Sequence, residues 1–337
     1  MAGVSTQTVS RVINDRPDVS PQTRANVKKV ILDLGYSPNT IARSLSRGRT
    51  NTLGVVGFGL KYFGPSSVLT GIERKANELG FSIILTLCEQ FEGGDTDQVL
   101  LQLSAQQVEG IIWAIPGFID SLDPSRMVKE KLTIPIVYLN RDCLNSSVVV
   151  SMDNRSGGYI ATEHLFEQGY HKIGIITGPK TWWEANERLI GWREVMREKN
   201  FTDIDDLIFE GNWEAESGDR GFQTLKSKNP DLDAIFVSND QMSLGVIHAA
   251  NRMGISIPDK FGIVGFDDLP ESSFYIPPLS TVKQDAKKLG ALAVTRLVEW
   301  IESESDQECD TQEKNLVSPE LIIRQSSVRE KALISHT

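Results

Sequence analysis

The segment LGVVGF at residues 53–58 is the first of eight short apolar runs that decide the fold. The runs are rich in Val and Ile, and amphipathic stretches of helical length separate most of them. Strands buried on both faces of a parallel sheet have this composition, and crossover helices connect them. The other seven runs are SIILTL (82–87), GIIWAI (110–115), IPIVYL (134–139), VVVS (148–151), KIGIITG (172–178), AIFVS (234–238) and FGIVGF (261–266).

Eight or more such strands exceed what a single lobe of this kind usually contains. We therefore expect a doubly wound α/β core with two similar lobes. In open α/β sheets a ligand binds outside the carboxyl ends of the strands. The sequence therefore predicts a ligand site in the cleft between the two lobes.

The first 50 residues have a different pattern, that of short helices. Ser5 is a suitable N-cap, and Ser20-Pro21 combines an N-cap with proline at the first helical position. Gly35 is a suitable residue to end the second helix. The predicted helices cover about 6–14, 21–34 and 40–47, and the second has an apolar stripe of Val27, Val30, Ile31 and Leu34.

The charge of the chain is unevenly distributed. The net charge is −10, but the first 50 residues contain eight basic and three acidic residues, a net charge of +5, which leaves −15 for the remainder. A basic segment attached to an acidic body is typical of proteins that contact nucleic acid phosphates. The alternative is a solvated basic tail.

Several classes of protein do not fit the sequence. The first residues, MAGVSTQTVSRVIND, lack the apolar core of a secretory signal, and no apolar run approaches the roughly 18 residues that span a bilayer. Cys88, Cys143 and Cys309 lie far apart in no metal-ligand spacing, which indicates reduced thiols. We therefore expect a cytoplasmic, nucleoid-associated protein with no membrane contact, no metal and no cofactor.

Seven segments together resemble the lactose/galactose repressor family of bacterial regulators, in the family's order and over nearly the whole chain. They are GVSTQTVSRVIND (3–15), PDVSPQTRANVKKVILDLGYSPN (17–39), TIARSLSRGRTNTLGVV (40–56), SMDNRSGGYIATEHLFEQGYHKIGIITGP (151–179), VSNDQMSLGVIHAANRMGISIPD (237–259), GFDDLPESSFYIPPLSTVKQD (265–285) and SPELIIRQSS (318–327).

The resemblance implies a small all-α helix-turn-helix headpiece and a hinge helix, followed by a two-lobed core like that of type I periplasmic sugar-binding proteins. The implied parts are a headpiece at 1–38, a hinge helix and linker at 39–51, a core at 52–330 and a tail at 331–337. Within the core, lobe 1 is expected at about 52–151 and 283–310, and lobe 2 at about 152–282 and 311–330.

By the same resemblance, the helix after Ser5 is the recognition helix that enters the major groove. Gln7 can form two hydrogen bonds with adenine, and Arg11 can do the same with guanine. Each such pair discriminates against the wrong base by about 1–3 kcal/mol, while short polar side chains can contact phosphates. Leu45 matches the family's minor-groove wedge. The implied DNA contacts are Ser5, Thr6, Gln7, Thr8, Ser10, Arg11, Asn14, Asn39, Arg43 and Leu45. The alternative is that these residues merely solvate a helix.

The chain departs from the family at its start. Family members have a further helix before this point, and without it Val9, Val12 and Ile13 would lack a partner in a domain already hard to stabilise. Either the start codon is misassigned and the natural protein is longer, the explanation we favour, or the regulator is truncated within the helix-turn-helix and binds DNA weakly or not at all.

The implied effector site lies in the cleft. Arg188 matches an arginine that holds sugar hydroxyls, Asp267 can accept two hydrogen bonds, and Trp213 matches an aromatic that packs on the ligand. The implied effector contacts are Phe58, Tyr62, Pro65, Asn140, Val150, Arg188, Trp213, Asn239, Asp267 and Gln284.

Each of these assignments has a structural alternative. Asp267 and Asp268 could cap a helix, Arg188 could lie on a helix surface, and Trp213 could belong to a lobe core. The pair Trp182-Trp183 fits either the cleft mouth or simple packing. Two further differences leave the sugar's identity open, since Asn140 replaces an aspartate of lactose-type sites and Ala286 replaces an aromatic residue.

These observations predict a sequence-specific transcriptional repressor, active as a homodimer on a palindromic operator, whose DNA affinity is controlled by a carbohydrate such as a disaccharide or other glycoside. The end of the chain, REKALISHT, has no sustained leucine heptad that would favour a tetramer. The sequence leaves open whether the ligand releases DNA or promotes its binding.

The sequence has three alternative interpretations. One is a sugar-binding receptor without effective DNA binding, because the first headpiece helix is missing; another is an extracytoplasmic uptake protein. The third is an enzyme, but the sequence has no GxSxG, no GxxxxGK[ST] and no complete GxGxxG, since GFG at 57–59 lacks the third glycine. The four histidines, His164, His171, His248 and His336, have no metal-ligand spacing. We therefore predict that the chain is not an enzyme.

Overall fold

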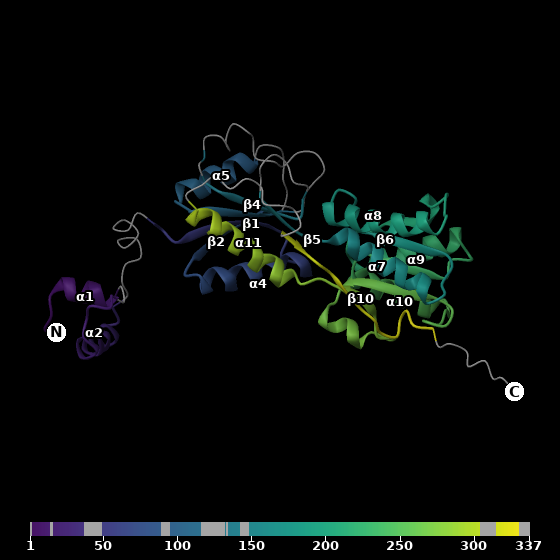
Figure 1. Ribbon diagram of the computed structural model, residues 1–337. Coiled ribbons are helices and arrows are strands. Elements are labelled where there is room, and N and C mark those ends of the chain that lie inside the picture. The colour runs from purple at the N-terminus through teal and green to yellow at the C-terminus, as the bar shows by residue number, and fades with distance from the viewer. Residues whose placement is uncertain are drawn as a thin grey trace. The chain divides into compact units, whose positions relative to one another are not determined.

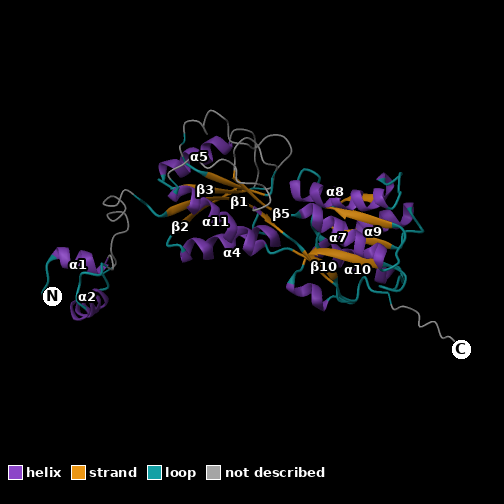
Figure 2. Cartoon of the chain, viewed as in Figure 1, coloured by secondary structure: helices purple, strands orange, loops and turns teal. Residues whose placement is uncertain are grey.

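The computed structural model divides the chain into two compact units, Met1–Asn51 and Thr52–Thr337 (Figures 1 and 2). The boundary falls where the sequence pattern changes from short helices to alternating apolar runs. The structure describes residues 2–13, 16–36, 49–88, 95–115, 132, 134–141, 148–303 and 315–329.

The first unit contains two described helices, α1 (Thr6–Ile13) and α2 (Pro21–Asp33). Both begin as predicted, because the hydroxyls of Ser5 and Ser20 accept hydrogen bonds from the backbone N–H three residues later, at 3.1 and 3.2 Å. Gly35 follows α2 with a φ of 57°, the left-handed conformation that glycine adopts readily at the end of a helix.

The two helices contact each other through a small apolar core. Val12 of α1 and Val27 of α2 are both buried. The expectation that Val12 lacks a partner was therefore wrong. Leu34 was expected in the buried stripe but is 56% exposed, because the described part of this unit offers nothing that covers it.

The second unit contains two six-stranded sheets. Their strand orders are β11-β5-β4-β3-β1-β2 and β12-β10-β9-β8-β6-β7, and every pairing is parallel except that between β10 and β12. We call the part around the first sheet the first lobe and the part around the other sheet the second lobe. The strands are β1 (Thr52–Phe58), β2 (Ser82–Cys88), β3 (Gly110–Ala114), β4 (Ile136–Leu139), β5 (Val148–Met152), β6 (Ile173–Thr177), β7 (Ile208–Glu210), β8 (Ala234–Val237), β9 (Gly262–Asp267), β10 (Ser280–Lys283), β11 (Leu316–Val317) and β12 (Glu320–Ile322).

Helices cover both faces of each sheet. In the first lobe α4 and α11 pack on one face and α5 on the other, while α7 to α10 surround the second sheet (Figures 1 and 2). Within the described residues, no helix is both long and apolar enough to cross a membrane. The helices are α4 (Phe63–Glu78), α5 (Asp95–Ala105), α7 (Asn154–Glu167), α8 (Trp183–Glu198), α9 (Ala215–Lys228), α10 (Asp240–Arg252) and α11 (Ala286–Glu302), with short 3₁₀ turns η1 (Asp205–Leu207) and η2 (Pro270–Phe274).

The chain crosses between the lobes three times, after β5, after β10 and after β11. The third crossing differs from the expected boundary, which assigned everything from residue 311 to the second lobe. Instead β11 pairs with Ser151 and Met152 of β5, so the first lobe extends to Val317. A two-residue strand is too short to give a periodic signal, and this explains the difference.

Candidate functional site

A pocket lies between the two lobes at the carboxyl ends of several parallel strands, the position that the fold favours for a ligand. The empty space in and around it is about 1000 Å³, a volume that includes open solvent at its mouth. Nine of the ten effector contacts implied by the sequence line it. They are Phe58, Tyr62, Pro65, Asn140, Arg188, Trp213, Asn239, Asp267 and Gln284.

The tenth residue, Val150, lies elsewhere. Its side chain is fully buried in the apolar core of the first lobe and does not line the pocket. Its backbone carbonyl accepts a hydrogen bond from the N–H of Asn140 at 3.1 Å. Val150 therefore holds a pocket residue in place but offers no side chain to a ligand.

Arg188 of α8 is the central cation of the pocket. It is buried, not on the helix surface as the alternative proposed, and its guanidinium stacks over the Phe266 ring at 3.7 Å from the centroid. Nε donates to Asn154 Oδ1 at 2.8 Å, and Nη1 donates to the carbonyl of Ser238 at 2.5 Å. Nη2 has no hydrogen bond within the described residues, so this nitrogen can serve a ligand.

Asp267 follows β9 and faces Arg188, with 4.0 Å between Oδ1 and Nη1. Gln284 donates a hydrogen bond to the same oxygen. Burial raises the pKa of Asp267 to about 6, against the opposing attraction of Arg188. The neighbouring Asp268 is instead paired with Arg324 at 2.7 Å, a structural contact within the second lobe.

Asn239 has both ends of its side-chain amide engaged. It is the N-cap of α10, accepting from the N–H of Met242 at 2.8 Å, and it donates to the carbonyl of Trp213 at 3.0 Å. It thus fixes Trp213, which has a φ of 73°. A ligand can reach Asn239 only by sharing or replacing these bonds.

Asp240, the next residue, is fully buried and does not line the pocket. It accepts hydrogen bonds from the N–H of Leu269 at 2.9 Å and from the hydroxyls of Ser272 and Thr281, both at 2.6 Å. Burial, followed by repulsion from Asp267, raises its pKa to about 7. Its contacts make it an internal anchor of the second lobe.

Aromatic side chains from both lobes meet at the pocket. Trp182 packs edge-on against Phe58 and Tyr62 of the first lobe, with ring centroids 5.5 Å apart in each case, and against Trp213 of the second lobe at 5.6 Å. Trp182 therefore lines the pocket, whereas Trp183 does not. Leucines of the first lobe extend this apolar wall: Leu60, Leu69, Leu85, Leu87 and Leu139.

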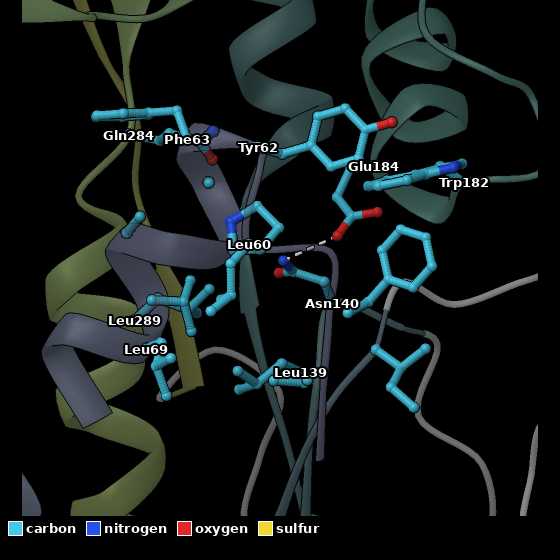
Figure 3. Close-up of a pocket in the computed structure, with 18 of the residues that line it drawn as sticks. Leu60, Tyr62, Phe63, Leu69, Leu139, Asn140, Trp182, Glu184, Gln284 and Leu289 are labelled. Carbon is cyan, nitrogen blue, oxygen red and sulfur yellow. Dashed lines mark hydrogen bonds between the residues drawn. The ribbon is translucent and has the colours of Figure 1, made fainter. Parts of the chain in front are cut away.

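Glu184 also lines the pocket, although it is not among the contacts predicted from the sequence. Figure 3 shows its carboxylate directed at Asn140, whose Nδ2 donates to Oε1 at 3.1 Å. Burial raises the pKa of Glu184. The available signal was its position four residues before Arg188, which places both side chains on one face of a helix.

The backbone is constrained at several lining positions. Asn140 has a φ of 48° and Asp267 a φ of 108°, conformations that are uncommon for residues other than glycine, although asparagine and aspartate adopt the left-handed region more often than most. Strain of this kind collects at binding sites, where the surrounding structure holds side chains in a fixed direction. No group of His, Cys, Asp and Glu that could hold a metal occurs in the ranges that the structure describes.

The predicted DNA contacts lie in the first unit. Thr6, Gln7, Ser10 and Arg11 are exposed on α1, and Thr8 is half-buried. The Ser5 hydroxyl is used as the N-cap, and Arg11 pairs with Asp18 at 3.3 Å. The remaining predicted contacts lie outside the described residues: Asn14, Asn39, Arg43 and Leu45.

Comparisons with known proteins agree with this division of the chain. Residues 1–39 match the model of bacterial regulatory proteins of the lacI family, and residues 162–327 match a periplasmic binding protein-like domain. The chain is 32% identical to the lactose operon repressor of Escherichia coli K12, over 88% of this chain and 82% of that one. It is 34% identical to the HTH-type transcriptional repressor PurR of Haemophilus influenzae PittEE, over 97% and 96%.

A solved structure shows the same fold. The lac repressor dimer bound to operator and the anti-inducer ONPF superposes with a TM-score of 0.83 and 29% identity, covering 97% of this chain and 96% of that chain. The match thus includes both the N-terminal helices and the two-lobed core.

Proposed function

The chain belongs to the lacI family of bacterial regulatory proteins. We propose that it is a transcriptional repressor whose affinity for a specific operator is controlled by a small carbohydrate. The ligand binds between the lobes, and the recognition helix α1 contacts the DNA. The proposed protein is a cytoplasmic, nucleoid-associated homodimer on a palindromic operator, and it binds its ligand without chemical turnover.

The observation that carries this proposal is the composition of the pocket. Arg188 and Asp267 form a donor and acceptor pair on the second lobe, which suits neighbouring hydroxyl groups. The aromatic wall of the same pocket, in which Trp182 contacts Phe58 and Tyr62, suits the apolar face of a sugar ring. A solved structure at 29% identity, described as a complex of the transcriptional regulator CelR with cellobiose, supports the same ligand class.

The DNA-binding part of the proposal is supported by α1. Exposed Thr6, Gln7 and Arg11 lie in the first turns of a capped helix, where side chains of a helix-turn-helix reach base edges. Arg11 can exchange its exposed pairing with Asp18 for a base, because surface ion pairs contribute little stability.

The proposal is tested by fluorescence anisotropy with DNA from upstream of the gene, with and without lactose, cellobiose and 2-nitrophenyl β-galactoside. We expect salt-dependent binding of one sequence, and a change of about 5–150-fold in its affinity with at least one sugar. Binding of a sugar without any operator would favour the receptor alternative. Operator binding that no sugar changes would contradict carbohydrate control.

A further inference from the structure

One buried oxygen of the pocket has no partner in the part of the chain that the structure describes. Oε2 of Glu184 is shielded from solvent, and no hydrogen bond or ion pair reaches it from any residue in the described ranges. Resting on the proposed function, we propose that Glu184 is a specificity-determining contact of the carbohydrate site. Its Oε2 accepts a hydrogen bond from a donor of the sugar, a hydroxyl or an ammonium group.

The orientation of Glu184 is set from the first lobe. Asn140 donates from Nδ2 to Oε1 of Glu184 at 3.1 Å (Figure 3). Its own Oδ1 accepts from the N–H of Met152 at 3.0 Å. Both ends of the Asn140 amide are therefore fixed. Asn140 is a positioning residue that holds one carboxylate oxygen and leaves the other to a ligand in the pocket.

The nearby cation does not satisfy this carboxylate. Arg188 lies on the same helix, but its hydrogen bonds go to Asn154 and Ser238, and its only ion-pair partner in the described structure is Asp267. Arg188 attracts the Glu184 carboxylate through space but donates no hydrogen bond to it in the described structure, and it has two further acids near it, Asp267 and Asp240. The pocket thus contains two acids near one cation: Asp267 pairs with Arg188, and Glu184 has no ion-pair partner in the described residues.

A structural role alone does not account for this arrangement. An unpaired buried carboxylate destabilises the protein, and a glutamine would keep an oxygen acceptor for Asn140 without the charge. An ionised carboxylate only accepts hydrogen bonds, so a sugar with a donor at this point is favoured over a deoxy or O-methyl analogue. Glu184 therefore selects among ligands that Arg188 and Asp267 would bind alike.

The test compares full-length wild type, Glu184→Gln and the control Glu187→Gln, which removes a carboxylate from α8 outside the pocket lining. Isothermal titration uses lactose, cellobiose and the diamino counterpart of cellobiose, and circular dichroism with thermal melts confirms that each variant folds. We expect Glu184→Gln to weaken binding of the sugar that wild type binds by about 10–100-fold, and Glu187→Gln to leave it within about twofold.

The probes distinguish the two donors. If the ligand donates from an ammonium group, wild type prefers the diamino disaccharide and Glu184→Gln loses that preference; if it donates from a hydroxyl, the variant weakens the neutral sugar. Equal sugar affinities of wild type and Glu184→Gln would overturn this inference and leave the proposed function standing. Binding of no probe by wild type would contradict the carbohydrate ligand itself, and this inference with it.

Discussion

Arg188 shows how far the pocket is organised before a ligand arrives. Asn154, the Ser238 carbonyl and the Phe266 ring fix its guanidinium in one plane. Little rotamer freedom then remains to be lost on binding, and preorganisation of this kind increases affinity. The planar fork also has a nitrogen, Nη2, that makes no hydrogen bond to the described residues, and Arg188 lines the pocket.

Arg188→Lys should therefore impair sugar binding although the positive charge remains. An ammonium group cannot donate in two fixed directions or stack on Phe266, and we expect affinity to fall by roughly 10–100-fold. Isothermal titration measures this, with Arg193→Lys on the same helix as the matched control. Unchanged affinity in Arg188→Lys would mean that the fork does not contact the sugar.

Asp240 predicts how stability depends on pH. Its pKa is about 7 in the folded protein against an ordinary value of 3.8, so the folded state keeps a proton that the unfolded state releases. Its contribution to the free energy of unfolding is complete below about pH 4 and is lost as the pH rises towards 7.

Asp240→Asn removes this titration. The free energy of unfolding of wild type minus that of the variant should fall between about pH 5 and 7, by at most about 1.4 kcal/mol per pH unit. Urea unfolding at several pH values measures the difference. A difference that stays constant or grows with pH would show that Asp240 is ionised throughout this range.

Among the helices, each lobe contains one pair whose backbones pack closely against each other. Gly218 of α9 and Gly245 of α10 face each other's backbones: a Cβ at Gly245 would collide with the Ala215 carbonyl, and one at Gly218 with the Met242 carbonyl. The same reciprocal arrangement occurs between α4 and α11, through Gly71 and Gly290. These contacts require glycine because backbone atoms cannot move aside.

Gly245→Ala should destabilise the protein by about 1–3 kcal/mol, the usual cost of an overpacked core. Gly64→Ala is the control, since a Cβ there meets nothing within 4 Å on a helix, and the change should be neutral or stabilising by about 0.4–1 kcal/mol. Urea unfolding without ligand compares the two. Equal stabilities would show that α9 and α10 can separate without loss.

The recognition helix gives a prediction about specificity. Gln7→Ala should cost about 1–3 kcal/mol of operator binding per half-site, with little effect on unrelated DNA, because a base contact is lost while phosphate contacts remain. Gln22→Ala, an exposed glutamine of α2, is the matched control. Anisotropy with both DNAs measures the effect, and an equal loss on both would argue against base reading by Gln7.

Elements with a strong periodic signal were predictable from the sequence. All eight apolar runs are strands, but β7, β10, β11 and β12 were missed. They are two to four residues long and include polar residues such as Lys283 and Glu320, so pairing with neighbouring strands decides them and local pattern does not. The third crossing between lobes was misplaced for the same reason.

The pocket was predictable mainly through the family resemblance. Spacing alone could not show that Phe58 and Trp182 meet across the lobes, because their contact depends on tertiary packing. Val150 was wrong as a side-chain contact, since its side of β5 faces the core. Glu184 was not predicted as a pocket residue, because an acid on an amphipathic helix normally lies on the face exposed to solvent.

At the scale of the whole molecule, the pocket is where the two lobes contact each other. Lys61 of the first lobe pairs with Glu214 of the second at 3.2 Å, and Asn140 bonds Glu184. A ligand among these contacts can change the relation of the lobes only by binding one arrangement better than another. The coupling free energy by which the sugar changes operator affinity equals that by which the operator changes sugar affinity.

The most direct measurement of this coupling is a closed thermodynamic cycle. Operator affinity is measured with and without a saturating sugar, and sugar affinity is measured on free and on operator-bound protein. If sugar and operator are coupled through the lobes, both affinities change by the same factor, on the order of 5–150-fold, and in the same direction. A sugar that binds in the pocket while operator affinity stays the same would contradict it.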